Sequence, residues 1–125
     1  TMITQKRATG NRGEESAAEY LISQGYSIVE RNFNTKFGEI DIVARNPGGD
    51  IVFVEVKSAK KGSFIMPEEN ITFHKLRKFS KTIEMFLLMR RISCDQKWQM
   101  DSIAVLFDGQ SGRAEVRHIE NINIR

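Results

Sequence analysis

Hydrophobic residues mark out a pair of strands in the first half of the chain. Residues 38–44 and 51–57 are rich in Val and Ile, and side chains along a strand point alternately to opposite faces, so both segments are predicted to be β-strands. The sequence Asn46-Pro47-Gly48-Gly49-Asp50 between them favours a chain reversal, which predicts an antiparallel hairpin. The residues expected to give each strand one wholly apolar, buried face are Ile40, Ile42 and Ala44 on the first strand and Val52, Val54 and Val56 on the second.

Two further segments carry apolar residues at helical spacing. The first is expected to form a helix over residues 12–24, with Asn11 as its N-cap and Glu14 three residues later, as in a capping box. The second spans residues 72–91, where apolar residues recur every three or four positions. The residues expected to face the core are Ala17, Ala18, Leu21 and Ile22 in the first helix and Leu76, Phe79, Ile83, Phe86 and Leu87 in the second.

Three more segments have strand character. Residues 26–33 are expected to form an edge strand, and residues 98–107 and 113–119 form two later strands joined by a Gly-rich turn. The order of elements is then α-β-β-β-α-β-β, and a hairpin followed by a helical crossover predicts a mixed β-sheet flanked by helices, in the α/β class. At 125 residues the chain is expected to be a single domain, with residues 1–9 as a flexible or vector-derived tail.

The composition excludes several functional classes. One cysteine, Cys94, cannot form an internal disulfide, and with only two histidines the chain lacks a zinc-ligand set. Cys94 is expected in a helix-to-strand loop. The longest apolar runs are far shorter than a membrane span, and no signal-peptide pattern opens the chain. These features predict a cytoplasmic protein without a membrane partner.

Charged residues interrupt the apolar hairpin at four positions. Glu39 and Asp41 share one face of the first strand, and Glu55 and Lys57 share one face of the second. In an antiparallel hairpin Asp41 and Glu55 can lie opposite or diagonal to each other, within reach of one divalent ion. Two carboxylates, a backbone carbonyl and waters suit Mg²⁺, and Lys57 could approach a phosphate or an attacking water beside it. The alternative is a cross-strand salt bridge between Lys57 and one carboxylate.

An acidic residue on one strand followed by Glu-x-Lys on the next resembles the PD-(D/E)xK nuclease superfamily. The ordered set of motifs is similar to one branch of it, the YraN-like family of uncharacterised, resolvase-like bacterial proteins. The similarity covers roughly residues 10–90 and continues weakly at residues 100–103. Ile40 departs from the superfamily's Pro, and Ile65 departs from the family's Gly two residues before Pro67. The matching residues are Gly10-Asn11-Arg12-Gly13-Glu14, Ala17-Ala18-Glu19-Tyr20-Leu21, Gly25-Tyr26, Glu30-Arg31-Asn32, Gly38-Glu39-Ile40-Asp41 and Val52-Phe53-Val54-Glu55-Val56-Lys57, with Pro67, Ile71 and Lys75.

The resemblance implies a restriction-endonuclease-like core and a metal-dependent endonuclease that hydrolyses phosphodiester bonds in DNA, with branched or Holliday-junction DNA among the candidate substrates. It implies that Asp41, Glu55 and the backbone carbonyl of Val56 bind Mg²⁺ or Mn²⁺, and that Lys57 is catalytic. Glu14 occupies the position of a helix-borne catalytic acid that helps to hold the metal. For Glu14 the structural alternative is helix capping.

Two other acids, Glu15 and Asp101, are further candidates for the same site. Glu15 is the outside candidate for the role of Glu14. Asp101 lies in a strand near the core, and a structural role is expected for it.

Cations follow the polar side of the second helix and the end of the hairpin. A charge run is usually a solvated face, but beside a nuclease site these cations are expected to contact nucleic acid, with DNA as the expected partner. The alternative function is a catalytically silent nucleic-acid-binding module on the same fold. A homodimer is also open, with Phe33, Phe37 and Phe64 as aromatics that could line an interface or belong to the core. The expected nucleic-acid-binding residues are Lys60, Lys61, His74, Lys75, Arg77, Lys78 and Lys81.

Overall fold

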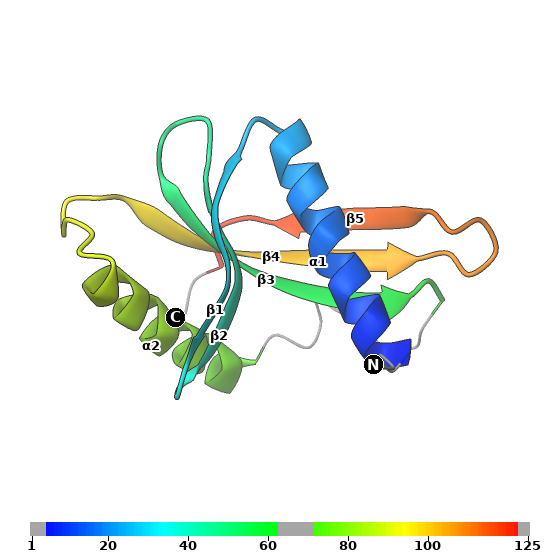
Figure 1. Cartoon of the computed structure of the whole chain (residues 1–125), viewed down its shortest axis with the longest axis horizontal. Coiled ribbons are helices and arrows are strands. Elements are labelled where there is room, and N and C mark those ends of the chain that lie inside the picture. Colours follow the sequence, from blue (N-terminus) through cyan, green and yellow to red (C-terminus); the bar gives the residue numbers. More distant parts are fainter. Residues whose placement is uncertain (1–4, 63–71, 123–125) are drawn as a thin grey trace.

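A five-stranded mixed sheet with a helix packed on each face forms the body of the protein (Figure 1). The computed structural model describes residues 5–62 and 72–122, with side chains from residue 12 onward. Ile65 and Phe64 therefore lie outside the described residues. The elements are α1 (Gln5–Ser23), β1 (Ser27–Thr35), β2 (Gly38–Arg45), β3 (Ile51–Lys60), α2 (Phe73–Met89), β4 (Trp98–Phe107) and β5 (Ala114–Ile119). This order confirms the predicted α-β-β-β-α-β-β arrangement and fold class.

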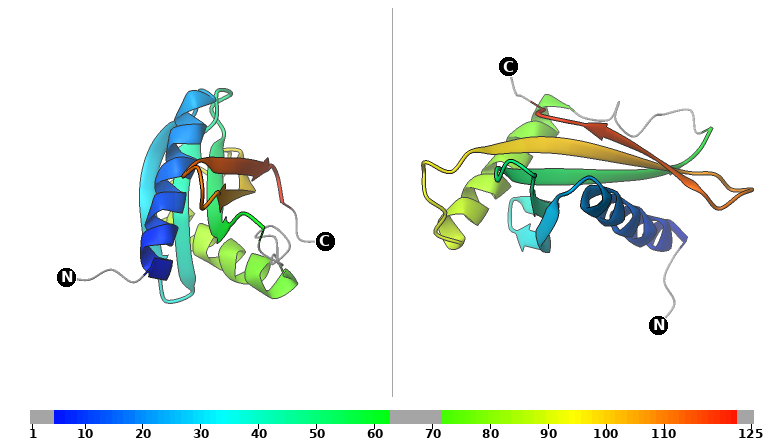
Figure 2. Two further views of the ribbon diagram at one scale, coloured as in Figure 1. Left: turned by 90° about the vertical axis from the view of Figure 1, so that its right-hand side faces the viewer. Right: turned by 90° about the horizontal axis from the view of Figure 1, so that it is seen from above.

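The strands follow one another across the sheet in sequence order, β1-β2-β3-β4-β5. Short connections join β1 to β2, β2 to β3 and β4 to β5, and each of these pairs is antiparallel. The β3–β4 pair is parallel, because the chain returns through α2 before β4 begins. The right-hand view in Figure 2 shows the long β3 and β4 strands side by side, with the shorter β5 next to β4. The prediction that the first strand lies at an edge is confirmed.

Each face of the sheet has its own apolar core, and β3 contributes to both. Val52 and Val54 pack with Leu21 of α1 on one face, whereas Phe53 packs with Phe86 of α2 on the other. Helices on both faces leave the central strands no solvent side, so these strands are apolar at nearly every position. Charged residues within them are exceptions to this pattern, among them Glu55 and Lys57 on β3 and Asp101 on β4.

The first helix begins earlier than predicted. It starts at Gln5, so Asn11 lies inside the helix and the predicted N-cap and capping box of Glu14 are wrong. Residues 5–9, expected to be part of a tail, belong to the same helix. An N-cap preference is worth only about 1 kcal/mol, so a residue that suits an N-cap does not by itself fix where a helix begins.

The second helix and the following loop agree with the predictions. Thr72 caps α2 by accepting a hydrogen bond from the Lys75 backbone N–H, and the helix ends at Met89. Cys94 lies exposed in the connection between α2 and β4. Within the described ranges, neither helix combines the length and apolar character that crossing a membrane requires.

One strand changes face in a way that the pattern did not predict. Arg31 pairs with Ile42, Phe33 pairs with Ile40, and Asn32 between them has a φ of 56°. This left-handed residue breaks the regular alternation, so Ile40 packs with Phe33 in the α2-side core while Ile42 packs in the α1-side core. The expectation that Ile40 shares a face with Ile42 is therefore wrong.

Candidate active site

Asp41 lies on β2 directly beside the Glu-x-Lys segment of β3. The register pairs Ile42 with Val54, which places the preceding Asp41 next to Glu55. The Val56 backbone N–H donates a hydrogen bond to Oδ2 of Asp41 at 2.7 Å. The Asp41 carboxylate is thus hydrogen-bonded to the backbone of the segment that carries Glu55 and Lys57.

The Asp41 carboxyl is in an environment that disfavours its charge. Burial raises its pKa from 3.8 to about 7, against the hydrogen bond from Val56, which lowers it. The carboxylates of Glu14 and Glu39 raise the pKa further, and Glu14 also shares a side-chain hydrogen bond with Asp41. Glu39 was not among the predicted site residues, although strand alternation had placed it on the same face as Asp41.

Glu55 and Lys57 form an ion pair along a single strand. Nζ of Lys57 lies 2.9 Å from Oε1 of Glu55, and both side chains are partly buried, with exposed fractions of 32% and 20%. Residues two apart on a strand point to the same face, which allows this contact. The alternative expectation for Lys57 was a salt bridge to a carboxylate on the other strand. The salt bridge that forms joins two residues of the same strand, β3. Lys57 is thus held beside Glu55, which is one of the predicted metal ligands.

A close approach of α1 to β3 brings Glu14 to Asp41. A Cβ atom on Gly13 would lie 1.7 Å from Oγ and 3.0 Å from Cβ of Ser58, which directly follows Lys57. Glycine at this position therefore permits the contact between helix and strand. Glu15 points elsewhere, because its carboxylate pairs with Arg31 at 3.1 Å and is 61% exposed.

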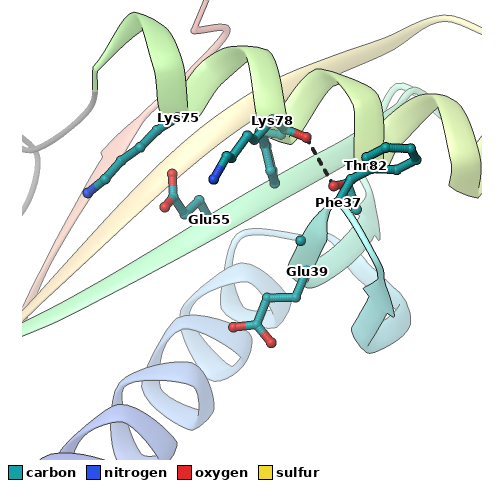
Figure 3. A pocket seen from close by; sticks show the side chains of 8 residues that line it. Phe37, Glu39, Glu55, Lys75, Lys78 and Thr82 are labelled. Carbon is teal, nitrogen blue, oxygen red and sulfur yellow. Dashed lines mark hydrogen bonds between the residues drawn. The ribbon is translucent and has the colours of Figure 1, made fainter.

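A cavity of about 280 Å³ opens on the α2 side of Glu55. Figure 3 shows Lys75 and Lys78 extending from α2 towards Glu55, with Glu39 lower on the same opening. Two of the predicted cations therefore border the cavity that contains a predicted metal ligand. The residues that line it are Phe37, Gly38, Glu39, Glu55, Lys75, Lys78, Phe79 and Thr82.

The other predicted cations divide between two places. His74, Arg77 and Lys81 lie on exposed positions of α2. Lys60 pairs with Phe107 at the far end of β3, and Lys61 lines a separate hollow with Asp108 and Arg113.

A second group of ionisable residues lies on the α1 side of the sheet. Asp101, His118 and Glu120 each place a ligand atom within 4.8 Å of the other two, so this group could hold a metal ion. Nε2 of His118 lies 2.7 Å from Asp101 Oδ2, and its Nδ1 lies 3.1 Å from the Tyr20 hydroxyl. Sequence reasoning missed His118 and Glu120, because they approach Asp101 only through the pairing of β4 with β5.

The fold defines the chain as an α/β protein with a five-stranded mixed sheet between two helices, and a group of carboxylates surrounds Asp41 on β2. A model of the uncharacterised protein family UPF0102 matches residues 13–105. The chain belongs to this family, which confirms the resemblance to a family of uncharacterised bacterial proteins.

Relatives that carry the same family name extend over most of the chain. The UPF0102 protein of Desulforamulus reducens is 40% identical over 124 residues, which cover 96% of this chain and 98% of the relative. The UPF0102 protein of Pelobacter propionicus is 44% identical over 122 residues, covering 97% of this chain and 86% of the relative.

Two solved structures are also similar to this chain. One is a complex of EndoMS with double-stranded DNA, at a TM-score of 0.42 and 16% identity, covering 70% of this chain and 34% of that one. The other is SfsA of Pyrococcus furiosus in complex with Ca²⁺, at a TM-score of 0.43 and 15% identity, covering 95% and 65%.

Proposed function

We propose that this protein is a Mg²⁺- or Mn²⁺-dependent endonuclease that hydrolyses phosphodiester bonds in DNA, with branched or junction DNA among its substrates. The observation that carries the proposal is the partly buried Asp41 carboxyl, whose pKa is raised to about 7 by burial and by two further carboxylates. A carboxyl with a perturbed pKa is typical of sites that perform chemistry, and the neighbouring Glu55 lines an open cavity.

The donor set fits a hard divalent cation. Asp41, Glu55, Glu14 and the Val56 carbonyl offer only oxygen atoms, which Mg²⁺ and Mn²⁺ prefer. Oγ of Ser102 is buried without a hydrogen-bond partner in the described part of the chain, and the register places it beside Glu55. When bound, such a cation would polarise the scissile phosphate and lower the pKa of an attacking water.

Lys57 supplies positive charge at the same place. Its ammonium is fixed 2.9 Å from Glu55, so it can orient a water or donate hydrogen bonds to a phosphate oxygen that gains negative charge. Lys75 and Lys78 border the cavity and can attract the flanking phosphates. The protein thereby combines an acidic centre for a cation with a basic rim for the DNA backbone.

The competing hypothesis is a DNA-binding module without turnover. Buried carboxylates would then repel the phosphates that the basic rim attracts. The nuclease hypothesis explains both the carboxylates and the basic rim. We also propose that the protein acts in the cytoplasm, because the free thiol of Cys94 suits a reducing environment.

The experiment compares metal binding and cleavage in matched variants. Mn²⁺ and Mg²⁺ are titrated calorimetrically into wild type, Asp41→Asn, Glu14→Gln and Glu15→Gln, and each protein is incubated with labelled junction, flap, duplex and single-stranded DNA. Glu15→Gln is the matched control, since Glu15 neighbours Glu14 in sequence and pairs with Arg31. We expect Asp41→Asn to lose most metal binding and to reduce cleavage at least 100-fold.

Two outcomes contradict this proposal. Wild-type protein that cuts none of the substrates with either metal would remove the enzymatic function. Metal binding that survives in Asp41→Asn and disappears in His118→Gln would move the metal to the group around Asp101.

A further inference from the structure

A second hollow, of about 390 Å³, lies between α2 and the turn that joins β1 to β2. Its described lining contains five basic residues and a single aromatic ring, without a carboxylate. A cavity of this size is in the range of small-ligand sites, roughly 300–1,000 Å³. The residues that line it are Lys36, Phe37, His74, Arg77, Lys78 and Lys81.

Phe37 differs from the phenylalanines of the core. Phe33, Phe53 and Phe86 are at most 4% exposed, whereas Phe37 is 37% exposed. Nζ of Lys36 lies 5.3 Å from the centre of the Phe37 ring, and Nζ of Lys81 lies 6.0 Å from it. An accessible ring among cations offers a flat apolar surface for a base and positive charge for its phosphates.

The turn holds the ring in place. The Phe37 backbone N–H donates to Oγ1 of Thr35 at 3.1 Å, and the same hydroxyl donates to the Gly38 carbonyl at 3.2 Å. Gly38 has a φ of 149°, and a Cβ there would lie 3.4 Å from the Thr82 hydroxyl of α2. The ring is therefore presented from a turn whose backbone is fixed against the helix.

This hollow adjoins the candidate active site. Phe37 and Lys78 line both this hollow and the cavity that contains Glu55 and Glu39. Figure 3 shows Phe37 beside Thr82, with Lys78 between it and Glu55. A strand that placed one base against Phe37 could therefore place a neighbouring phosphate towards Glu55.

We propose that Phe37 is a stacking platform for an unpaired base, and that the substrate enters this site as single-stranded DNA. A base inside a continuous duplex is stacked on both sides, so it cannot present a face to Phe37 without being unstacked. The site therefore favours the single-stranded arm of a branched or flapped DNA. The inference about cleavage rests on the proposed nuclease function, whereas the stacking itself does not.

The test measures binding with EDTA present, so that cleavage plays no part. Fluorescence anisotropy follows a labelled oligothymidylate and a labelled duplex of equal length, added to wild type, Phe37→Ala, Phe37→Trp and Phe73→Ala. Phe73 is the matched control, because it is a 57% exposed aromatic on α2 that neighbours Arg77 but lines neither cavity.

We expect Phe37→Ala to weaken single-strand binding about 10-fold and to change duplex binding less than 2-fold. Phe37→Trp should retain single-strand affinity, and Phe73→Ala should behave as wild type. Unchanged single-strand affinity in Phe37→Ala, or equal losses for both DNA forms, would overturn the stacking platform. A protein that shows the expected binding but cuts no DNA with Mg²⁺ or Mn²⁺ would refute the nuclease proposal alone.

Discussion

Two aspartates on the same sheet, the buried Asp101 and the partly buried Asp41, have opposite surroundings. Asp101 on β4 is surrounded by donors, because its carboxylate accepts from Nε2 of Gln99 and the Asn121 backbone N–H, both at 2.9 Å, and lies 2.7 Å from Nε2 of His118. Asp41 on β2 accepts a hydrogen bond from the Val56 backbone N–H, but its other neighbours include the carboxylates of Glu14 and Glu39.

The difference shows that burial alone does not identify a functional carboxylate. A buried charge is costly unless hydrogen bonds or a counter-charge compensate it. The partners of Asp101 come from β4, β5 and the segment after β5, so its carboxylate connects these three segments through hydrogen bonds. Asp41 lacks such compensation in the protein alone, and a divalent cation would supply it.

Removing Asp101 is expected to have the largest effect and tests whether its hydrogen bonds stabilise the fold. Asp101→Ala leaves the donors of Gln99, His118 and Asn121 without their acceptor in a buried place. We expect the free energy of unfolding to fall by about 3–5 kcal/mol, measured by urea denaturation. Asp108→Ala, at the exposed end of β4, is the control. A loss below about 1 kcal/mol would show that the donors find other partners.

Asp41→Asn, unlike Asp101→Ala, should raise the free energy of unfolding of the metal-free protein. The folded-state pKa is raised from 3.8 to about 7, so the contribution of this group is full below pH 4 and is lost as pH rises towards 7. At pH 8 in EDTA the variant should therefore be more stable than wild type, by at most roughly 4 kcal/mol. The gap should close at pH 4, and Mg²⁺ should narrow it at pH 8 by binding wild type. A variant less stable than wild type at pH 8 would contradict this picture.

Gly13→Ala tests how α1 supports the Asp41 environment. The added Cβ meets Ser58, and overpacking of this kind costs about 1–3 kcal/mol. Because the helix must shift, Glu14 should move from Asp41 and metal affinity should fall. A second change, Ser58→Ala, removes the closest clashing atom and should restore part of both quantities, measured by urea denaturation and Mn²⁺ titration. Equal stability in the single and double variants would show that Ser58 is not the obstacle.

The smallest effect is expected at Glu30, an acid near the surface with a good partner. Arg90 donates to both oxygens of Glu30, at 2.9 and 2.7 Å, and lowers the pKa of that carboxyl. A lowered pKa stabilises the fold above pH 4.5 and loses that contribution as pH falls below it. Glu30→Gln should therefore lower the thermal midpoint slightly at pH 7 and not at pH 3. An equal difference at both pH values would assign the effect to packing.

The sequence by itself determined the elements and their order. The period of the apolar residues predicted α2, the edge strand and the β2–β3 hairpin, because this period reflects which side of each element faces a core. The same pattern placed Asp41 and Glu55 across one hairpin. These features depend on residues that are near in sequence, so local preference and alternation are sufficient to predict them.

Tertiary structure alone decided the environment of each charged group. The left-handed Asn32 moved Ile40 to the other face, and α1 begins at Gln5, before its predicted N-cap Asn11. Glu14 and Asp41 belong to elements far apart in sequence, as do Asp101 and His118, and packing brings each pair together. Whether a buried carboxylate gains donors or other carboxylates depends on which distant segments pack against it, and this cannot be read from the residues next to it in the chain.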